Sequence, residues 1–272
     1  SAKKRKAREE AVRVLPDSLK QARPTSARLG VHRELGVPIF LSDDIRRRHV
    51  HILGTTGSGK TESVVLNLAG QDIARGYPAI IVDAKGDESF MEFLTRAVPK
   101  SKLHIFDPAD PDSTPYNPTR SGSPLQAAQR QHNSFVWSEP FYEGKALSAL
   151  QRLFAQHWLR LGENPSLMML ASYMESPQKF FALLNIQDPE RQKLELKAFE
   201  QLSGLQDQLN LLTTPPFDRL LSPPKDAPQI DLGKAIEAND VVYFRLQALL
   251  SPKSAQIIGR MVINELCHLA GS

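Results

Sequence analysis

The period of the apolar positions in the first half of the chain changes between two and about 3.6, as in strands that alternate with helices. Short apolar or alternating runs predict strands at 49–53, 79–82 and 102–106. Helical spacing predicts helices at 61–75 and 88–97, the first of them ended by Gly76. This order favours a parallel sheet with right-handed crossover connections.

The second half of the chain has a different character. From 125 to about 210 no segment has the pattern of a strand, and leucines and aromatic residues recur at helical spacing. Prolines gather on either side of this block, at 107–124 and 214–228, and indicate its boundaries. Beyond it, 241–246 predicts another strand and 253–269 an amphipathic helix. The predicted fold class is therefore α/β, with an all-helical block within it.

The leading segment is polar and basic. Residues 1–22 have a helical pattern, and two glycines within 28–42 indicate a short hairpin or a strand that enters the domain. The first fifty residues carry a net charge of +7, against +4 for the whole chain. The run Lys3–Arg8 is consistent with a solvated arm, or with contact to the phosphates of a membrane surface or a nucleic acid.

Composition excludes several classes of protein. The chain of 272 residues suffices for one large α/β domain, or for one domain with a second inserted in it. A hydrophobic share of 41% and a charged share of 24% argue against a disordered or collagen-like chain. No apolar run approaches the ~18–20 residues of a membrane-spanning helix, and the basic N-terminal run lacks the apolar stretch of a secretory signal. The single cysteine, Cys267, favours a reducing compartment.

One glycine-rich octapeptide carries most of the chemistry. It fits G-x-x-x-x-G-K-[ST] and reads Gly54-Thr55-Thr56-Gly57-Ser58-Gly59-Lys60-Thr61. Its glycines let backbone amides point at phosphate oxygens, and the predicted helix that follows adds its positive N-terminal dipole. Lys60 would neutralise the β- and γ-phosphates, and the Thr61 hydroxyl would bind Mg²⁺. We therefore predict a nucleotide site over 54–62, which includes Glu62, with ATP and Mg²⁺ as cofactors.

Hydrolysis also requires an acid for the magnesium shell and a base that orients water. Asp83 ends the apolar run at 79–82, and Asp87 closes the Lys-Gly-Asp turn that follows. Both are candidate catalytic residues beside Lys60, with local turn formation as the alternative.

Other polar residues give weaker signals. His49 and His51 are predicted on one strand face, and packed or surface histidines are favoured because no third metal ligand lies near. Gln247 follows the predicted strand at 241–246, where a sensor of the γ-phosphate could lie. Glu265 has helical spacing and is predicted to be exposed. Core packing is favoured over a docking surface for four aromatic residues of the helical block: Phe135, Trp137, Phe141 and Tyr142.

These motifs together resemble the type IV secretion coupling proteins of the TraG/TraD class, conjugation ATPases distantly related to the FtsK/HerA DNA pumps. The resemblance spans about residues 28–270 and depends on the order of several segments, since the phosphate loop alone is generic. The segments are RHVHIL before the loop, the loop itself, IIVDAKGD at 80–87, FDP at 106–108, YNP at 116–118, IDL at 230–232 and VVYF at 241–244.

The resemblance implies a RecA-like P-loop NTPase with a mostly parallel sheet and an inserted all-α domain. The expected parts are a basic segment at 1–27, a nucleotide-binding domain at 28–124 and 213–272, and the inserted domain at 125–212. The family's second acidic motif and its membrane helices are not in the sequence. We therefore expect a piece of a longer protein, incomplete at its C-terminus, that binds nucleotide but hydrolyses it poorly by itself.

The resemblance also implies surroundings and partners. Proteins of this class assemble as hexamers on the cytoplasmic face of the bacterial inner membrane, anchored by N-terminal helices. They bind ATP between subunits, often with a neighbour's arginine. They recruit relaxase-bound DNA or protein effectors to the components of a secretion channel, and direct DNA contact is expected.

Three hypotheses follow for the function. The first is an ATP-driven coupling ATPase that recruits and drives such substrates into the channel. The second is a DNA translocase of the FtsK/HerA kind. The third is a recruitment module whose helical block binds cargo or an adaptor, while nucleotide stabilises the assembly without hydrolysis.

Overall fold

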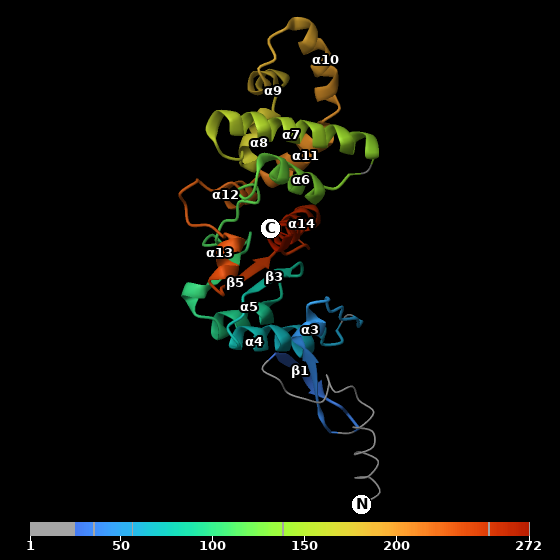
Figure 1. Ribbon diagram of the computed structural model, residues 1–272, viewed down its shortest axis with the longest axis vertical. Coiled ribbons are helices and arrows are strands. Elements are labelled where there is room, and N and C mark those ends of the chain that lie inside the picture. Colours follow the sequence, from blue (N-terminus) through green and yellow to red (C-terminus); the bar gives the residue numbers. More distant parts are fainter. Residues whose placement is uncertain (1–24, 35, 56, 138, 250, 272) are drawn as a thin grey trace, which may run out of the picture. The chain divides into compact units, whose positions relative to one another are not determined.

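The structure is a computed structural model that describes residues 25–34, 36–55, 57–137, 139–249 and 251–271 (Figure 1). Its contacts divide the chain into two units. The first contains residues up to Ala79 together with Glu88–Ser101, and the second contains Ile80–Asp87 and the chain from Lys102 onward. The helix predicted for 1–22 and the basic run Lys3–Arg8 lie outside the described residues.

An antiparallel hairpin begins the first unit. β1 (Ser26–Val31) pairs with β2 (Pro38–Ser42), and the register shifts between Arg28 and Gly30. At this bulge the side chain of Gln71 takes the place of a neighbouring strand, because its Oε1 accepts from Arg28 N at 2.7 Å and its Nε2 donates to Arg28 O at 2.9 Å. Of the two alternatives predicted within 28–42, a short hairpin or a strand that enters the domain, the structure has the hairpin.

Helices complete the first unit. They are α3 (Asp43–Arg46), a π-helical turn at Thr61–Val65, α4 (Leu66–Ala74) and α5 (Glu88–Ala97). Gly70 on α4 lets the ring of Phe93 on α5 approach closely, since a Cβ at this position would lie 3.0 Å from that ring. Gly76 follows α4 with φ +76°, so the predicted end of this helix is confirmed.

Four charged side chains connect α3 with α4. Asp43 and Asp72 each bind both Arg46 and Arg75, and Arg75 Nη1 lies 2.9 Å from Asp43 Oδ2. Burial opposes the charged form of Asp72, but hydrogen bonds from the two arginines outweigh it and hold the pKa of Asp72 below its ordinary value. Each of the two carboxylates therefore contacts both guanidinium groups, and these attractions offset the repulsion between like charges.

The strand predicted at 49–53 is wrong. The described residues there form no strand, and His49 has a φ of +74°. A strand exists only through hydrogen bonds to a neighbour, and no described segment pairs with 49–53. His49 and His51 therefore do not share a strand face.

The second unit contains a three-stranded sheet. Its order is β3 (Ala79–Asp83), β5 (Val241–Arg245) and β4 (Leu103–Phe106). β4 and β5 pair in parallel, with Leu103 opposite Val241 and Phe106 opposite Phe244. The central strand β5 is buried from Val241 to Phe244, as expected for a strand covered on both faces. The strands predicted at 79–82, 102–106 and 241–246 are confirmed.

Helices occupy the chain between β4 and β5. They are α6 (Pro124–Ser134), α7 (Pro140–Leu161), α8 (Leu167–Tyr173), α9 (Pro177–Leu184), α10 (Pro189–Glu200), α11 (Ser203–Leu212), α12 (Phe217–Leu221) and α13 (Leu232–Glu237). Ser123, Ser176 and Asp188 each cap a helix whose first residue is proline. No strand lies within the described part of this block, so the prediction of an all-helical segment from 125 to about 210 is confirmed.

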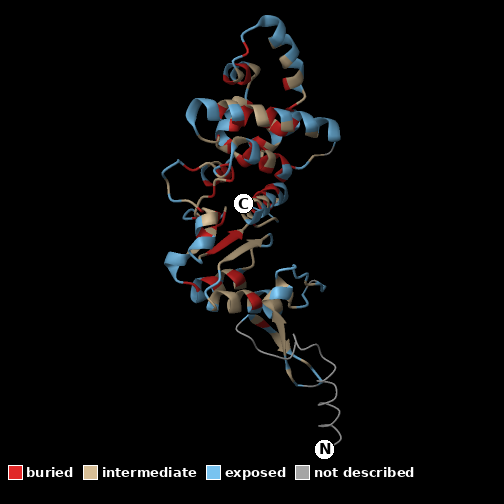
Figure 2. Cartoon of the chain, in the orientation of Figure 1, coloured by how far each residue is buried: buried red, intermediate tan, exposed pale blue. Residues whose placement is uncertain are grey.

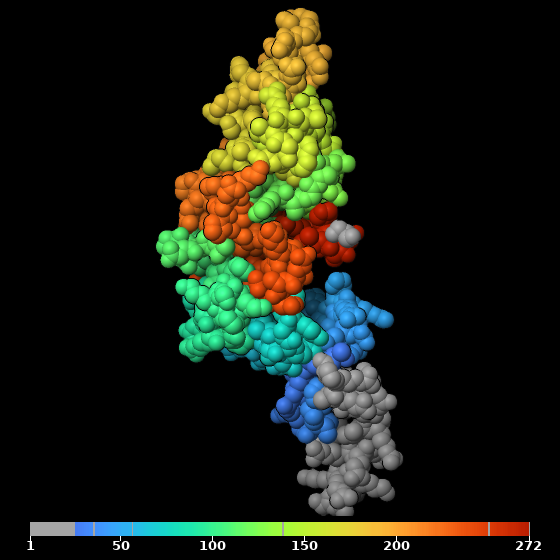
Figure 3. All heavy atoms as spheres, turned by 60° about the vertical axis from the view of Figure 1, so that its left-hand side comes forward, coloured from blue at the N-terminus to red at the C-terminus, as the bar shows by residue number. Residues whose placement is uncertain are grey.

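One hydrophobic core runs from the sheet into the helical block, seen as buried positions on both in Figure 2. The ring of Phe244 on β5 lies 5.5 Å from that of Phe106 and 5.2 Å from that of Tyr116. The proline-rich segment at 214–228, which leads from the helical block back to the sheet, packs against the block, because Met168 N donates to Ser222 Oγ at 3.0 Å. Figure 3 shows the orange spheres of this part of the chain against the yellow-green spheres of the block.

The four aromatic residues near the start of the block divide into two pairs. Phe135 is buried, and Trp137 packs against the core, as predicted. Phe141 and Tyr142 on α7 are 57% and 44% exposed, so core packing is the wrong prediction for this pair. After α13 and β5, the chain closes the unit with α14 (Pro252–Gly271).

Candidate functional site

The glycine-rich loop lies in the first unit, immediately before the helical turn that leads into α4. Gly57 and Gly59 have φ values of +79° and +75°, in the left-handed region where a side chain is strained. Lys60 Nζ donates to Gly54 O at 2.5 Å and to Thr55 O at 2.7 Å, which holds the ammonium group against the loop. Thr56 lies outside the described residues.

The helical turn begins directly at the end of the loop. Thr61 is its first residue, and Ser63 N donates to Gly59 O at 2.8 Å. The first amides of a helix have no partner within it, so this end carries partial positive charge. Ser58 and Glu62 are exposed beside it.

This geometry fits a nucleotide phosphate with a bound magnesium ion. A Cβ on Gly54 would lie 2.7 Å from Ser58 Oγ, so glycine at this position lets the Ser58 side chain lie close to the loop backbone. Lys60 supplies positive charge at the loop, and Thr61 supplies a hydroxyl at the start of the helical turn. The residues needed for both ligands are therefore present in one short segment.

Asp83 lies in the second unit, at the carboxyl end of β3, where it organises a turn. Its Oδ1 accepts from Lys85 N at 2.8 Å, and its Oδ2 accepts from Asp87 N at 2.7 Å. The Tyr243 hydroxyl donates to the same Oδ2 at 2.8 Å. Burial, with the hydrogen bond to Asp83, raises the pKa of Tyr243 well above its ordinary value, so the hydroxyl stays a donor.

A second set of polar contacts lies at the carboxyl ends of β4 and β5. Asp107, 2% exposed, binds Arg245 Nη1 at 3.0 Å and Gln247 Nε2 at 2.7 Å. Arg245 Nη2 also donates to Gly86 O at 2.9 Å. A Cβ on Gly86 would lie 2.8 Å from Gln247 Cγ, so this close approach requires glycine.

Sequence reasoning found part of this polar edge. Asp83 and Asp87 were candidates, and the turn-forming role of Asp83 is visible in its contacts. Tyr243 and Arg245 are not among the residues that the sequence predicts for this site. A signal exists for Arg245, which ends β5, because the ends of parallel strands meet at one edge of the sheet, whereas Tyr243 lies within the strand.

Glu265 corrects another prediction. It is 6% exposed rather than on the surface of α14. Its Oε1 accepts from Ser121 Oγ at 2.8 Å, and its Oε2 accepts from the Tyr116 hydroxyl. Burial raises the pKa of this carboxyl above its ordinary value. Helical spacing gave no indication that a loop more than a hundred residues earlier would cover the side chain.

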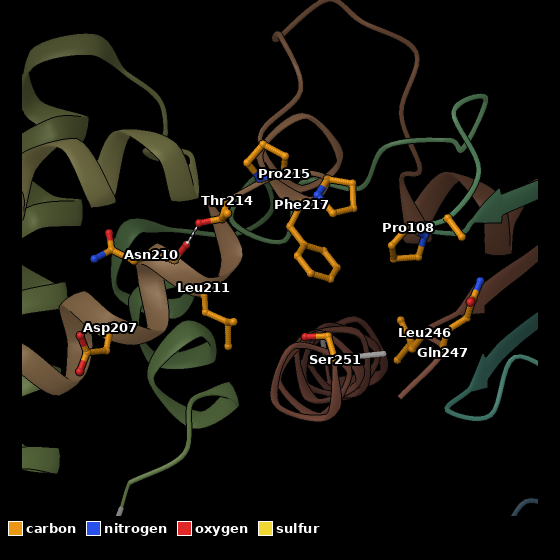
Figure 4. A pocket seen from close by; sticks show the side chains of 12 residues that line it. Pro108, Asp207, Asn210, Leu211, Thr214, Pro215, Phe217, Leu246, Gln247 and Ser251 are labelled. Carbon is orange, nitrogen blue, oxygen red and sulfur yellow. Dashed lines mark hydrogen bonds between the residues drawn. The ribbon is translucent and has the colours of Figure 1, made fainter. Parts of the chain in front are cut away.

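A cavity of about 590 Å³ opens beside the same edge of the sheet (Figure 4). Gln247 lines it, Phe217 points into it, and Asp207 and Asn210 project from α11. Most of its lining is apolar, with a few polar groups between. Cavities of this size and character commonly bind ligands.

Among the described residues, no group of three or more His, Cys, Asp or Glu side chains is placed to hold a metal ion. None of the described helices combines the length and the apolar character needed to cross a membrane.

Comparison with known proteins identifies the family. A model described as "Type IV secretion-system coupling protein DNA-binding domain" matches residues 35–186, more than half of the chain. The chain belongs to the type IV secretion-system coupling protein family. Over 60 residues it is also 42% identical to the type 4 coupling protein DotL of Legionella pneumophila subsp. pneumophila strain Philadelphia 1, a match that covers 22% of this chain and 8% of DotL.

Solved structures of the coupling protein TrwB have the same fold. An unbound form gives a TM-score of 0.67 at 17% identity, covering 97% of this chain and 58% of that chain. The complex of TrwB with ADPNP gives 0.62 at 17% identity and covers 92% and 57%, respectively. This chain therefore has the fold of a RecA-like P-loop NTPase with a helical domain, as predicted. The chain spans less than two thirds of these TrwB chains.

Proposed function

We propose that this coupling protein is an ATPase that recruits DNA–relaxase complexes or protein effectors and drives them into a type IV secretion channel. The observation that carries the proposal is the loop at 54–61, where two left-handed glycines and Lys60 form a phosphate-binding geometry before a helical turn. The printed descriptions of TrwB complexes name ADPNP and ADP with Mg²⁺, which supports the same ligands here.

The proposed roles follow from the chemistry of the side chains. Lys60 would bind the β- and γ-phosphates, and Thr61 would bind Mg²⁺. Gly54 to Glu62 would enclose the phosphates. Asp83 and Asp87 are the proposed acidic residues, although Asp83 already accepts three hydrogen bonds in its turn. Hydrolysis of ATP bound with Mg²⁺ would supply the free energy that drives substrates into the channel.

The assembly belongs to the same proposal. We expect a hexamer at the cytoplasmic face of the inner membrane, with nucleotide between subunits and contacts to DNA and channel components. The proposed domain limits are 1–27, 28–124, 125–212 and 213–272. The family description supports a contact with DNA.

Nucleotide binding by the full chain tests the phosphate loop. A fluorescent ATP analogue with Mg²⁺ should bind, and Lys60→Ala should weaken it at least about tenfold, a loss of about 1.4 kcal/mol or more. Lys197→Ala is the matched control, because Lys197 is exposed on α10. If the unsubstituted chain and Lys60→Ala bound the ATP analogue with equal affinity, the role of Lys60 in phosphate binding would be contradicted.

Recruitment without hydrolysis is the second candidate, and the cavity beside α11 together with exposed Phe141 and Tyr142 favours it. Transfer of substrate in cells separates the two candidates. Under the motor proposal, Lys60→Ala abolishes transfer while the protein accumulates normally. Normal transfer in this variant would favour recruitment. Membership in the coupling protein family favours both over a chromosomal DNA pump.

A further inference from the structure

A buried arginine with unused hydrogen-bond donors lies on α6, in the second unit. Arg130 is 7% exposed. Its Nη2 donates to Ser121 O at 2.5 Å and to Ser121 Oγ at 3.0 Å. Its Nε and Nη1 atoms are covered but have no hydrogen-bond partner among the described residues. Three N–H donors of the guanidinium are therefore unsatisfied.

The nearby carboxylate does not compensate for these donors. Glu265 accepts from the hydroxyls of Tyr116 and Ser121, and Ser121 alone connects it with Arg130 by hydrogen bonds. Burial lowers the pKa of Arg130 and the charge of Glu265 raises it by less, but among the described residues no hydrogen bond joins the two side chains. Buried charges are normally paired and fully hydrogen-bonded, because an unmet donor on a cation loses its water without a replacement. A hydrogen-bond acceptor beside Arg130 would therefore satisfy its unpaired donors.

Three side chains meet at one point beside this guanidinium. A Cβ on Gly122, which has a φ of +79°, would lie 2.9 Å from Arg130 Nη1. The same point lies 3.1 Å from His268 Nε2 and 3.2 Å from Gln126 Oε1. The Gln126 oxygen already accepts from Ser123 N at 2.9 Å, which leaves its amide nitrogen for another partner. Arg130 Nη1, His268 Nε2 and the side-chain oxygen of Gln126 thus converge on Gly122, where no side chain larger than hydrogen fits without displacing them.

A cavity of about 650 Å³ adjoins these side chains, and we call it the Arg130 cavity. Side chains from α6, α7 and α14 line it, among them five amides, Arg130 and His268. The described lining contains no carboxylate. The N-terminus of α6, capped by Ser123, adds positive potential at the same end. Donor groups and positive charge dominate this surface.

We propose that the Arg130 cavity binds a phosphate group, held by the guanidinium of Arg130, the imidazole of His268 and the amide nitrogen of Gln126. The planar guanidinium matches an oxyanion with two parallel hydrogen bonds. A phosphate offers further oxygens to donors that arrive from a second helix. All three side chains line the cavity, and Gln126 is exposed and His268 half-buried there. This inference does not depend on the proposed function.

Titration of inorganic phosphate into the full chain tests the site by NMR, at constant ionic strength in the Lys60→Ala background. This background weakens phosphate binding at the glycine-rich loop. We expect saturable shifts of the Gly122 and Ser123 amides. His268→Ala, which keeps the Arg130 contacts to Ser121, should weaken binding at least fivefold, and Arg130→Gln should abolish it. Lys197→Gln, far along the chain on α10, should bind as its parent does.

A short single-stranded oligothymidylate distinguishes the sources of the phosphate. Displacement of inorganic phosphate by the oligonucleotide would assign the site to a nucleic-acid backbone. Binding of inorganic phosphate without displacement would assign it to a free phosphate or a phosphate monoester. Absence of saturable shifts, or equal binding by folded His268→Ala and its parent, would overturn the proposal.

Discussion

At the scale of single residues, buried polar groups of this coupling protein are held by shared hydrogen bonds across long sequence separations. Asp83 accepts from a tyrosine 160 residues away, and Asp107 accepts from Arg245 over 138 residues. Glu265 accepts from Tyr116 over 149 residues. Each contact connects a residue at or near the sheet with a segment much later in the chain. Loss of one partner would leave the other buried without its hydrogen bond.

Glu265 gives a testable pH dependence. Its folded pKa is raised by burial, so the folded state favours the protonated carboxyl. Its contribution to stability is therefore full below the unfolded pKa of about 4.3 and declines as pH rises through the folded value. Glu265→Gln cannot ionise and should lack this decline. The midpoints of urea unfolding, measured for the parent protein and for Glu265→Gln from below the unfolded pKa upward, give the difference in stability between the two proteins at each pH.

The exposed residue Glu237 provides the control for that experiment. Glu237→Gln removes a carboxylate from the surface of the protein and should keep the pH dependence of the parent protein. If Glu265→Gln also followed the parent curve, Glu265 would not titrate differently in the folded state.

At the scale of elements, one helix completes a strand in the first unit. The bulge between Arg28 and Gly30 interrupts the ladder of β1 and β2, and the amide of Gln71 on α4 satisfies both backbone groups of Arg28. Asn67, one turn earlier, also donates to Arg28 O at 3.2 Å. A strand edge that would otherwise face water is thereby attached to α4.

Removal of this attachment should loosen the hairpin locally. In Gln71→Ala, the Arg28 amide loses its acceptor, at an expected cost of about 1–2 kcal/mol. Hydrogen exchange of that amide should accelerate by a factor of about 5–30. Gln71→Glu retains an acceptor for Arg28 N and should exchange more slowly than Gln71→Ala. Unchanged exchange at Arg28 in Gln71→Ala would show that the contact does not protect the strand.

At the scale of the whole molecule, the second unit has one core although its sequence alternates between sheet and helical block. Phe106 and Phe244 of the sheet belong to the same buried cluster as Leu150 and Phe154 of α7. The inserted helices therefore share a hydrophobic core with the sheet and do not form a separate core of their own. We expect the sheet and the helical block to unfold together.

Phe244→Ala tests this cooperativity. The residue is fully buried on β5, so its truncation should cost about 3–5 kcal/mol. The two tryptophans, Trp137 and Trp158, lie in the helical block and report its unfolding by fluorescence. Their transition should move to lower urea concentration, although the substitution is in the sheet. Leu249→Ala, at a position 94% exposed, is the control. An unmoved tryptophan transition in Phe244→Ala would mean that the block folds independently.

Much of the secondary structure could be predicted because its causes are local. The apolar runs that became β3, β4 and β5 and the helical spacing over 88–97 depend only on neighbouring residues. The segment 49–53 has a similar local pattern but forms no strand, because a strand also requires a hydrogen-bonded neighbour. The exposure of Phe141 and the burial of Glu265 likewise depend on what lies opposite, which spacing does not specify.

The sequence by itself determined the fold class, the all-helical block and the glycine-rich loop before α4. These features follow from residue spacing and from the backbone freedom of Gly57 and Gly59, and both properties act over a few residues. Only the tertiary structure decided that Asp107 binds Arg245 at the sheet edge, and that Arg130 lies buried beside a polar cavity with donors that have no partner among the described residues. Those contacts join residues far apart in the chain, and they form only when the strands and helices pack and exclude water.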